Sequence, residues 1–223
     1  MKKSCVVMAI GIMACGILYG IEQGIHVDYL TQSLVKIFLF LVIPLGFIRA
    51  EREERNMTVN RQRGARKNGW WHAILLGIFS FAAVLGGYYL LRSFIDFPHI
   101  VEDLQTRLKV SQMNYLLIGA YVVFFNSFLE EVFFRGFIFA RLYRNGQRVW
   151  AYLLSSLLFA LYHISIFKTW FTWPMMVLAL CGLAIGGLIF CWLNRKTLRI
   201  YHSWIAHIFA DLAIIWIGYT LFF

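Results

Sequence analysis

The chain has 223 residues, of which 61% are hydrophobic and only 14% are charged, and its mean hydropathy is +0.68. This composition excludes an ordinary soluble domain, because such domains carry roughly 25% charged residues. The net charge of +10 does not indicate a nucleic-acid partner, because the basic residues gather in alternate connections between apolar segments. We therefore expect an integral membrane protein whose surroundings are the lipid bilayer.

Long apolar segments follow one another along the chain and account for most of it. About 20 apolar residues cross the hydrocarbon core of a bilayer as a helix. Segments of this kind cover residues 4–21, 32–48, 70–91, 114–139, 150–166, 174–193 and 200–222. No internal repeat or low-complexity tract interrupts them. We predict an all-α, polytopic transmembrane helix bundle of about seven spans, which forms a single membrane domain over residues 1–223.

Lysine and arginine are divided unevenly between the two sides of this arrangement. Of the 21 basic residues, fifteen fall on the side of the N-terminus and four on the other side. Cytoplasmic loops of membrane proteins carry such an excess, so we predict a cytoplasmic N-terminus and an external C-terminus. Lys36 and Arg135 lie within spans instead. We expect Lys36 and His202, which are near span ends, to extend toward the lipid headgroups.

The first segment resembles a signal peptide, and residues 12–15 loosely match a lipoprotein cleavage site. Because methionine suits that site poorly, we expect an uncleaved helix. The four cysteines lie in spans without CxxC spacing, which favours packing roles over zinc or disulfide sites. We predict that the basic run 49–67 is a solvated loop beside anionic lipid. Residues 94–113 are predicted to be an external connection with a surface helix.

Ionisable side chains deep in the spans occur on the fourth, fifth and seventh segments alone. An ionised side chain near the bilayer centre costs at least ~2.5 kcal/mol, and such residues usually pair with each other and line a site. The sixth segment offers Gly182, Gly186 and Gly187 for close helix packing instead. The ionisable set is Glu130, Glu131 and Arg135 on the fourth segment, His163 on the fifth, and His207 and Asp211 on the seventh.

The spacing on the fourth segment separates its two glutamates. Glu131 and Arg135 are four positions apart and can pair on one helix face. Glu130 is rotated by about 100° from Glu131, and it shares its face with Asn126 and Phe134. We expect Glu130 to lack an ionic partner in an apolar cavity. A carboxylate there takes up a proton more readily, which suits a general base near neutral pH.

The two histidines come to the same depth as Glu130. Counting about 1.5 Å per residue from the cytoplasmic helix ends places Glu130, His163 and His207 roughly 10 to 20 Å deep. His207 and Asp211 are four positions apart, so the Asp211 carboxylate could accept a hydrogen bond from the imidazole and fix its tautomer. A carboxylate and two imidazoles at one depth are the groups that a hydrolytic site needs.

These residues form motifs on separate apolar segments within residues 114–222, in the order Glu130-Glu131-x-x-x-Arg135, Phe159-x-x-x-His163 and His207-x-x-x-Asp211. The pattern resembles the CPBP family of intramembrane proteases, which includes the type II CAAX prenyl endopeptidases and the bacterial Abi proteins. That family is linked to peptide processing and bacteriocin self-immunity. The resemblance implies a multi-pass protein of the cell membrane that cleaves a peptide or membrane-protein substrate.

The resemblance also implies roles for the individual residues. Glu130 would activate the attacking water, His163 and His207 would complete the catalytic site, and Glu131 and Arg135 would support it. In the prenyl endopeptidases the last motif position is commonly Asn, which is thought to help hold the oxyanion. An ionised Asp211 cannot donate a hydrogen bond. We therefore expect Asp211 to orient His207, or to act as a donor in its protonated form.

The resemblance leaves metal dependence open. Glu130, His163 and His207 are the candidate ligands of a catalytic zinc ion, and glutamate chemistry without a bound metal is the alternative. The chain lacks a His-Glu-x-x-His helix, so a zincin is not supported.

Two other classes of function fit the same fold. A bacteriocin-immunity or membrane-partner protein would not need proteolysis, although here the carboxylate and histidine positions are all filled. A proton-coupled transporter could also place Glu and His at mid-depth, but an internal repeat is not detectable. We therefore expect an intramembrane endopeptidase that hydrolyses a peptide bond of a membrane-associated or lipidated substrate with glutamate-activated water. The sequence specifies neither that peptide nor the oligomeric state.

Overall fold

The computed structural model describes residues 2–24, 29–55 and 70–223, and the regular elements within these ranges are all helices. Seven stretches are long and apolar enough to cross a membrane, and they confirm the predicted bundle. The spans are Lys3–Gly24, Leu30–Glu51, Trp70–Phe94, Tyr115–Arg144, Arg148–Trp170, Trp173–Asn194 and Tyr201–Phe222. Most of the basic run 49–67 lies outside the described residues.

The first three spans are built from long helices. The first span is α1 (Lys2–Gly24). The second span is one helix with a π-helical turn in its middle, and its parts are α2 (Tyr29–Ile37), η1 (Phe38–Val42) and α3 (Ile43–Arg55). The third span is α4 (Trp70–Leu91), which is followed by the short 3₁₀ turn η2 (Arg92–Phe94).

A short helix, α5 (Phe97–Thr106), follows the third span, in the connection where the sequence predicts a helix. The Asp96 side chain accepts a hydrogen bond from the backbone N–H of His99 at 3.1 Å, which caps the helix. Asp103 accepts hydrogen bonds from Arg107 at 2.8 Å and from the Trp170 indole at 2.7 Å. Burial opposes the charge of Asp103, but these two donors hold its pKa below its usual value. The bond from Trp170 also ties α5 to the end of the fifth span.

The fourth span alternates between α-helical and π-helical turns. Its parts are α6 (Tyr115–Ala120), η3 (Tyr121–Asn126), α7 (Ser127–Glu130), η4 (Glu131–Phe139) and α8 (Ala140–Arg144). π-Helical turns frequently occur at functional sites, and here η4 begins between the two glutamates. The remaining helices are α9 (Arg148–Tyr162), α10 (Ile164–Trp170), α11 (Trp173–Asn194) and α12 (Tyr201–Phe222).

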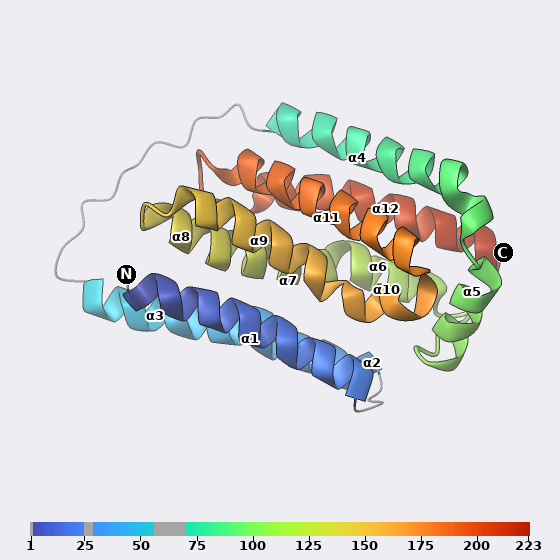
Figure 1. The fold of residues 1–223 in the computed structure, drawn as a ribbon, viewed down its shortest axis with the longest axis horizontal. Coiled ribbons are helices and arrows are strands. Elements are labelled where there is room, and N and C mark those ends of the chain that lie inside the picture. Colours follow the sequence, from blue (N-terminus) through green and yellow to red (C-terminus); the bar gives the residue numbers. More distant parts are fainter. Residues whose placement is uncertain (1, 25–28, 56–69) are drawn as a thin grey trace.

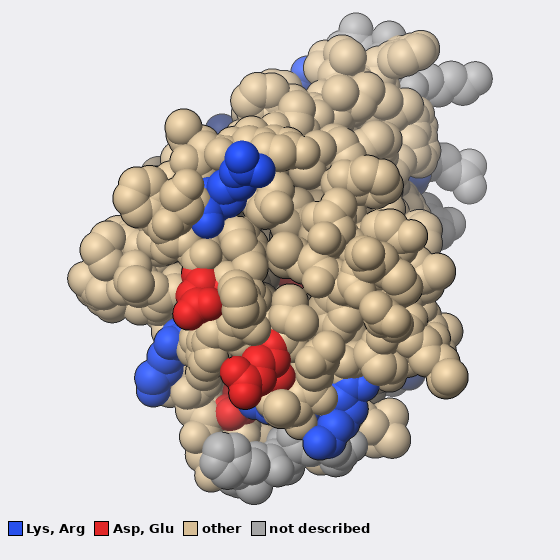
Figure 2. All heavy atoms as spheres, turned by 90° about the vertical axis from the view of Figure 1, so that its right-hand side faces the viewer, with Lys and Arg blue, Asp and Glu red and all other residues tan. Residues whose placement is uncertain are grey.

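The fourth span and α9 lie in the middle of the bundle (Figure 1). The first two spans cover one side of this centre, and α4, α11 and α12 cover the other. The N- and C-termini lie at opposite ends, as an odd number of spans requires. Figure 2 views the molecule from the end with the C-terminus, where the basic side chains lie apart from one another. This is the end to which the sequence assigns the smaller share of basic residues.

Aromatic and small residues hold the helices together. The Phe40 ring of the second span stacks on that of Phe133 with centroids 4.1 Å apart. A Cβ atom added at Gly187 would lie 3.0 Å from Ser156, so α11 and α9 approach closely there. Nothing lies within 4 Å of such an atom at Gly182 or Gly186, so the predicted packing role holds for Gly187 alone. The cysteines are free, and two of them, at positions 15 and 191, are buried.

Candidate active site

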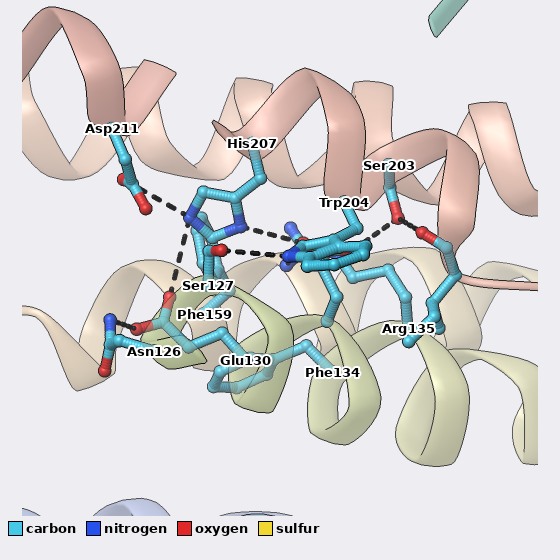
Figure 3. Close-up of polar contacts among 12 residues, drawn as sticks. Asn126, Ser127, Glu130, Phe134, Arg135, Phe159, Ser203, Trp204, His207 and Asp211 are labelled. Atoms are coloured by element: carbon cyan, nitrogen blue, oxygen red, sulfur yellow. Dashed lines mark hydrogen bonds and ion pairs between the residues drawn. The ribbon is translucent and has the colours of Figure 1, made fainter. Parts of the chain in front are cut away.

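The two adjacent glutamates of the fourth span are fully buried in the centre of the bundle and contact different neighbours. Glu130 is 1% exposed and Glu131 is 0% exposed. Figure 3 shows Glu130 on the fourth span below His207 of α12, with Asn126 beside it. Each glutamate is therefore shielded from bulk solvent, and its charge has to be compensated mainly by partners within the protein.

Glu131 holds α12 against the fourth span. Its Oε1 accepts a hydrogen bond from Arg135 at 2.8 Å, which confirms the predicted pair, and its Oε2 accepts one from the Ser203 hydroxyl. The Arg135 guanidinium lies 4.2 Å from the centre of the Phe159 ring. Asn194 in turn donates to Ser203 at 2.5 Å. A buried carboxylate with a charged partner and further donors is satisfied in place.

Glu130 has an ionic partner, so the prediction that it is unpaired is wrong. Lys36 of α2 donates to its Oε1 at 2.8 Å, Asn126 donates at 2.8 Å and the Tyr162 hydroxyl donates at 2.9 Å. The prediction that Lys36 extends to the headgroups is also wrong. Lys36 lies on the side of α2 that packs against the fourth and fifth spans, where a buried carboxylate offers it stronger interactions than the headgroups do.

His207 lies between three carboxylates. Its Nδ1 lies 3.1 Å from Glu131 Oε1, so Nδ1 carries the proton and donates to Glu131. Its Nε2 lies 3.8 Å from Glu130 Oε2 and 3.7 Å from Asp211 Oδ1, beyond hydrogen-bond distance of either. The carboxylate that fixes the imidazole is therefore Glu131 and not Asp211, because Nδ1 faces the fourth span.

His163 forms the end of α9. Its Nδ1 lies 2.7 Å from the carbonyl oxygen of Phe159, which leaves Nε2 for other partners. The ring packs against Tyr162 with centroids 4.5 Å apart, and it interacts electrostatically with Glu130 and His207. The structure thus brings Glu130, His163 and His207 together from three spans.

The donors near Glu130 do not fit a resident metal ion. Among the described residues, no group of three His, Cys, Asp or Glu side chains is arranged to hold a metal. The ammonium group of Lys36 lies against Glu130 Oε1, in the place where a cation would bind the carboxylate. The Nδ1 atoms of His163 and His207 are both engaged by protein oxygens, so only their Nε2 atoms are left for other partners. Glutamate chemistry without a bound metal therefore fits these donors better than a zinc site does.

Sequence reasoning missed several residues that shape the site, namely Lys36, Tyr162 and Ser203. The sequence does contain a signal for Lys36, because it is a cation inside an apolar span. Asn126 likewise is a polar residue on the helix face of Glu130. His202, expected at the headgroups, is 8% exposed. Its ring packs near that of Trp70, with centroids 5.3 Å apart.

Comparison with protein-family models matches residues 112–213 to the type II CAAX prenyl endopeptidase Rce1-like family. No curated protein and no solved structure matches the chain. The matched segment contains the three motifs and excludes Lys36. At the level of the family, the match supports a CAAX-type intramembrane protease. The part of the chain that carries the motifs is thus Rce1-like, and the resemblance to the CPBP family is confirmed.

Proposed function

We propose that this protein hydrolyses a peptide bond of a membrane-associated or lipidated substrate with water activated by Glu130. One observation carries the proposal. Glu130 Oε1 is held by three donors, whereas Oε2 lies 3.8 Å from His207 Nε2 without a hydrogen bond of its own among the described residues. A fixed carboxylate with one free oxygen beside an imidazole is suited to accept a proton from water.

The reaction follows from these positions. Glu130 Oε2 accepts a proton while the water oxygen bonds to the carbonyl carbon of the substrate. The carbonyl oxygen becomes an oxyanion, and His207 in its protonated form donates to it from Nε2. The proton then passes from Glu130 to the leaving nitrogen, and the carbon–nitrogen bond breaks. The products are an amine and a carboxylic acid, and the enzyme returns to its starting state.

The other residues support this sequence of steps. Glu131 keeps the proton of His207 on Nδ1, which fixes the direction of Nε2. The Asp211 carboxyl lies 3.7 Å from His207 Nε2, and its ionised form stabilises positive charge on the His207 imidazole. We assign His163 to the same site, because it interacts electrostatically with Glu130 and His207, and its Nε2 would contribute a polar group near the substrate carbonyl.

The experiment uses the purified protein in lipid vesicles with a quenched fluorescent peptide that ends in a farnesylated CAAX sequence. We expect Glu130→Gln to reduce cleavage by about 10²- to 10⁴-fold, the range of general acid–base catalysis. Gln preserves the shape of Glu and can still accept hydrogen bonds at Oε1. Glu102→Gln on α5 is the matched control. Cleavage by Glu130→Gln at the rate of the unchanged protein would refute the mechanism.

A second measurement covers substrates that this probe does not resemble. Peptide C-termini in membranes of cells that express the unchanged protein are compared with those from cells that express Glu130→Gln. Termini found only with the unchanged protein identify the substrate. Identical sets of termini would favour a role without proteolysis.

A further inference from the structure

Three side chains enclose one oxygen of Glu130. We call Lys36, Asn126 and Tyr162 the carboxylate clamp; they come from the second, fourth and fifth spans. Lys36 donates to Asn126 Oδ1 at 2.5 Å, to the Tyr162 hydroxyl at 2.6 Å and to Glu130 Oε1 at 2.8 Å. Asn126 and Tyr162 both donate to that same Oε1. The three clamp residues therefore bond to one another as well as to the glutamate.

The hydrogen bonds of the clamp are complete. An ammonium group has three donors and no acceptor, and all three donors of Lys36 have oxygen partners. Glu130 Oε1 accepts three hydrogen bonds, while Oε2 accepts none among the described residues and faces His207. The two carboxylate oxygens, equivalent in free glutamate, are thus made different by their surroundings.

Packing holds the clamp rigid. Lys36 is 9% exposed and Tyr162 is 6% exposed. The ammonium lies 4.7 Å from the centre of the Tyr162 ring and 5.5 Å from that of Phe40, and Phe40 itself stacks on Phe133. Catalytic groups need such support, because an ångström of freedom in the reacting atom reduces the rate.

We propose that Lys36 is a positioning residue for hydrolysis. It holds Glu130 Oε1, together with Asn126 and Tyr162, so that Oε2 alone faces the reacting water. This inference rests on the proposed function. It extends the site to a span outside the Rce1-like segment, because Lys36 precedes residue 112.

The first experiment measures kcat and KM for the farnesylated probe. We expect Lys36→Met to lower kcat by about 100-fold with little change in KM, since a mispositioned base weakens the transition state and not substrate binding. Tyr162→Phe removes a single hydroxyl with little risk to folding, and we expect about a tenfold loss of kcat for one hydrogen bond. Lys168→Met and Tyr152→Phe are the matched controls. Unchanged kcat in Lys36→Met, or a loss that appears only in KM, would overturn the positioning role of Lys36.

The second experiment does not depend on cleavage. Melting temperatures are compared for Lys36→Met, Glu130→Gln and the variant with both changes. Lys36→Met leaves a buried carboxylate without its cation, so we expect the double variant to melt above Lys36→Met. If the two changes simply add, Lys36 does not hold Glu130 and the inference fails. If the two changes couple but Glu130→Gln still cleaves the probe, Lys36 and Glu130 form a purely structural ion pair, and the proposed hydrolysis is refuted.

Discussion

Removing the Arg135 side chain tests whether the centre of the bundle depends on its internal ion pairs. The change Arg135→Met keeps most of the apolar volume but leaves Glu131 with Ser203 and His207 as its partners among the described residues. Both side chains of the Arg135–Glu131 pair are 0% exposed. Breaking a buried pair by removing one partner costs about 3 to 5 kcal/mol. We expect a value near 3 kcal/mol, because the two remaining donors compensate in part.

The chain offers a matched control with the same spacing and distance. Arg107 and Asp103 are also four positions apart and 2.8 Å from each other, but their side chains are 27% and 14% exposed. Water screens such a pair, so Arg107→Met should cost at most about 1 kcal/mol. Unfolding free energies in detergent, from denaturant titrations followed by circular dichroism, give both values.

A third variant separates the ion pair from the volume of the arginine. Glu131→Gln with Arg135→Met removes both charges, so we expect it to be more stable than Arg135→Met alone. The reasoning would be wrong if Arg135→Met and Arg107→Met cost the same. It would also be wrong if removing Glu131 restored nothing.

Three further outcomes follow from the geometry. Gly77→Leu should destabilise the protein by about 1 to 3 kcal/mol, because a Cβ atom there would lie 2.7 Å from Phe209. Gly86→Leu is the control and should cost less, because nothing lies within 4 Å of such an atom at Gly86. Thermal unfolding of the two variants gives the comparison. Treatment with a zinc chelator should leave cleavage of the farnesylated probe unchanged, because the Lys36 ammonium already neutralises Glu130 and no three ligand side chains of the described residues are arranged around a metal. Lost activity that zinc restores would contradict this. The pKa of Asp103 is lower in the folded protein than in the unfolded chain. Ionised Asp103 therefore stabilises the α5 contact at pH values above its unfolded pKa of about 3.9, and this stabilisation is lost as pH falls through the lower folded pKa. Hydrogen exchange in α5 should therefore rise near pH 3 in the unchanged protein, but Asp103→Asn should show little change between pH 5 and 3.

Features set by local periodicity could be predicted from the sequence. Hydropathy located the seven spans, because helix length and bilayer thickness are fixed quantities. The Glu131–Arg135 pair followed from a spacing of four residues. Even so, the fourth span contains π-helical turns that no such spacing indicated.

Contacts between distant segments could not be predicted in the same way. Lys36 and Glu130 are 94 positions apart, and His207 and Glu131 are 76 apart. Distance from the span end suggested that Lys36 reaches the headgroups, and that estimate ignores which side of α2 faces the bundle. The spacing of His207 and Asp211 suggested a hydrogen bond, yet the rotation of the imidazole directs Nδ1 to Glu131. Both errors arise because helix spacing fixes neighbours on one helix and not between helices.

The charges at the centre of the bundle are matched one to one, and this balance affects the proposed hydrolysis. Glu131 is neutralised by Arg135 on its own helix, and Glu130 by Lys36 on another span. His207 and Asp211 balance each other when both are ionised. A proton on Glu130 would leave the Lys36 ammonium without an anion in a medium that disfavours unpaired charge. The protonated intermediate is therefore disfavoured, so Lys36 would promote transfer of the proton to the leaving nitrogen as well as hold the carboxylate that removes it from water.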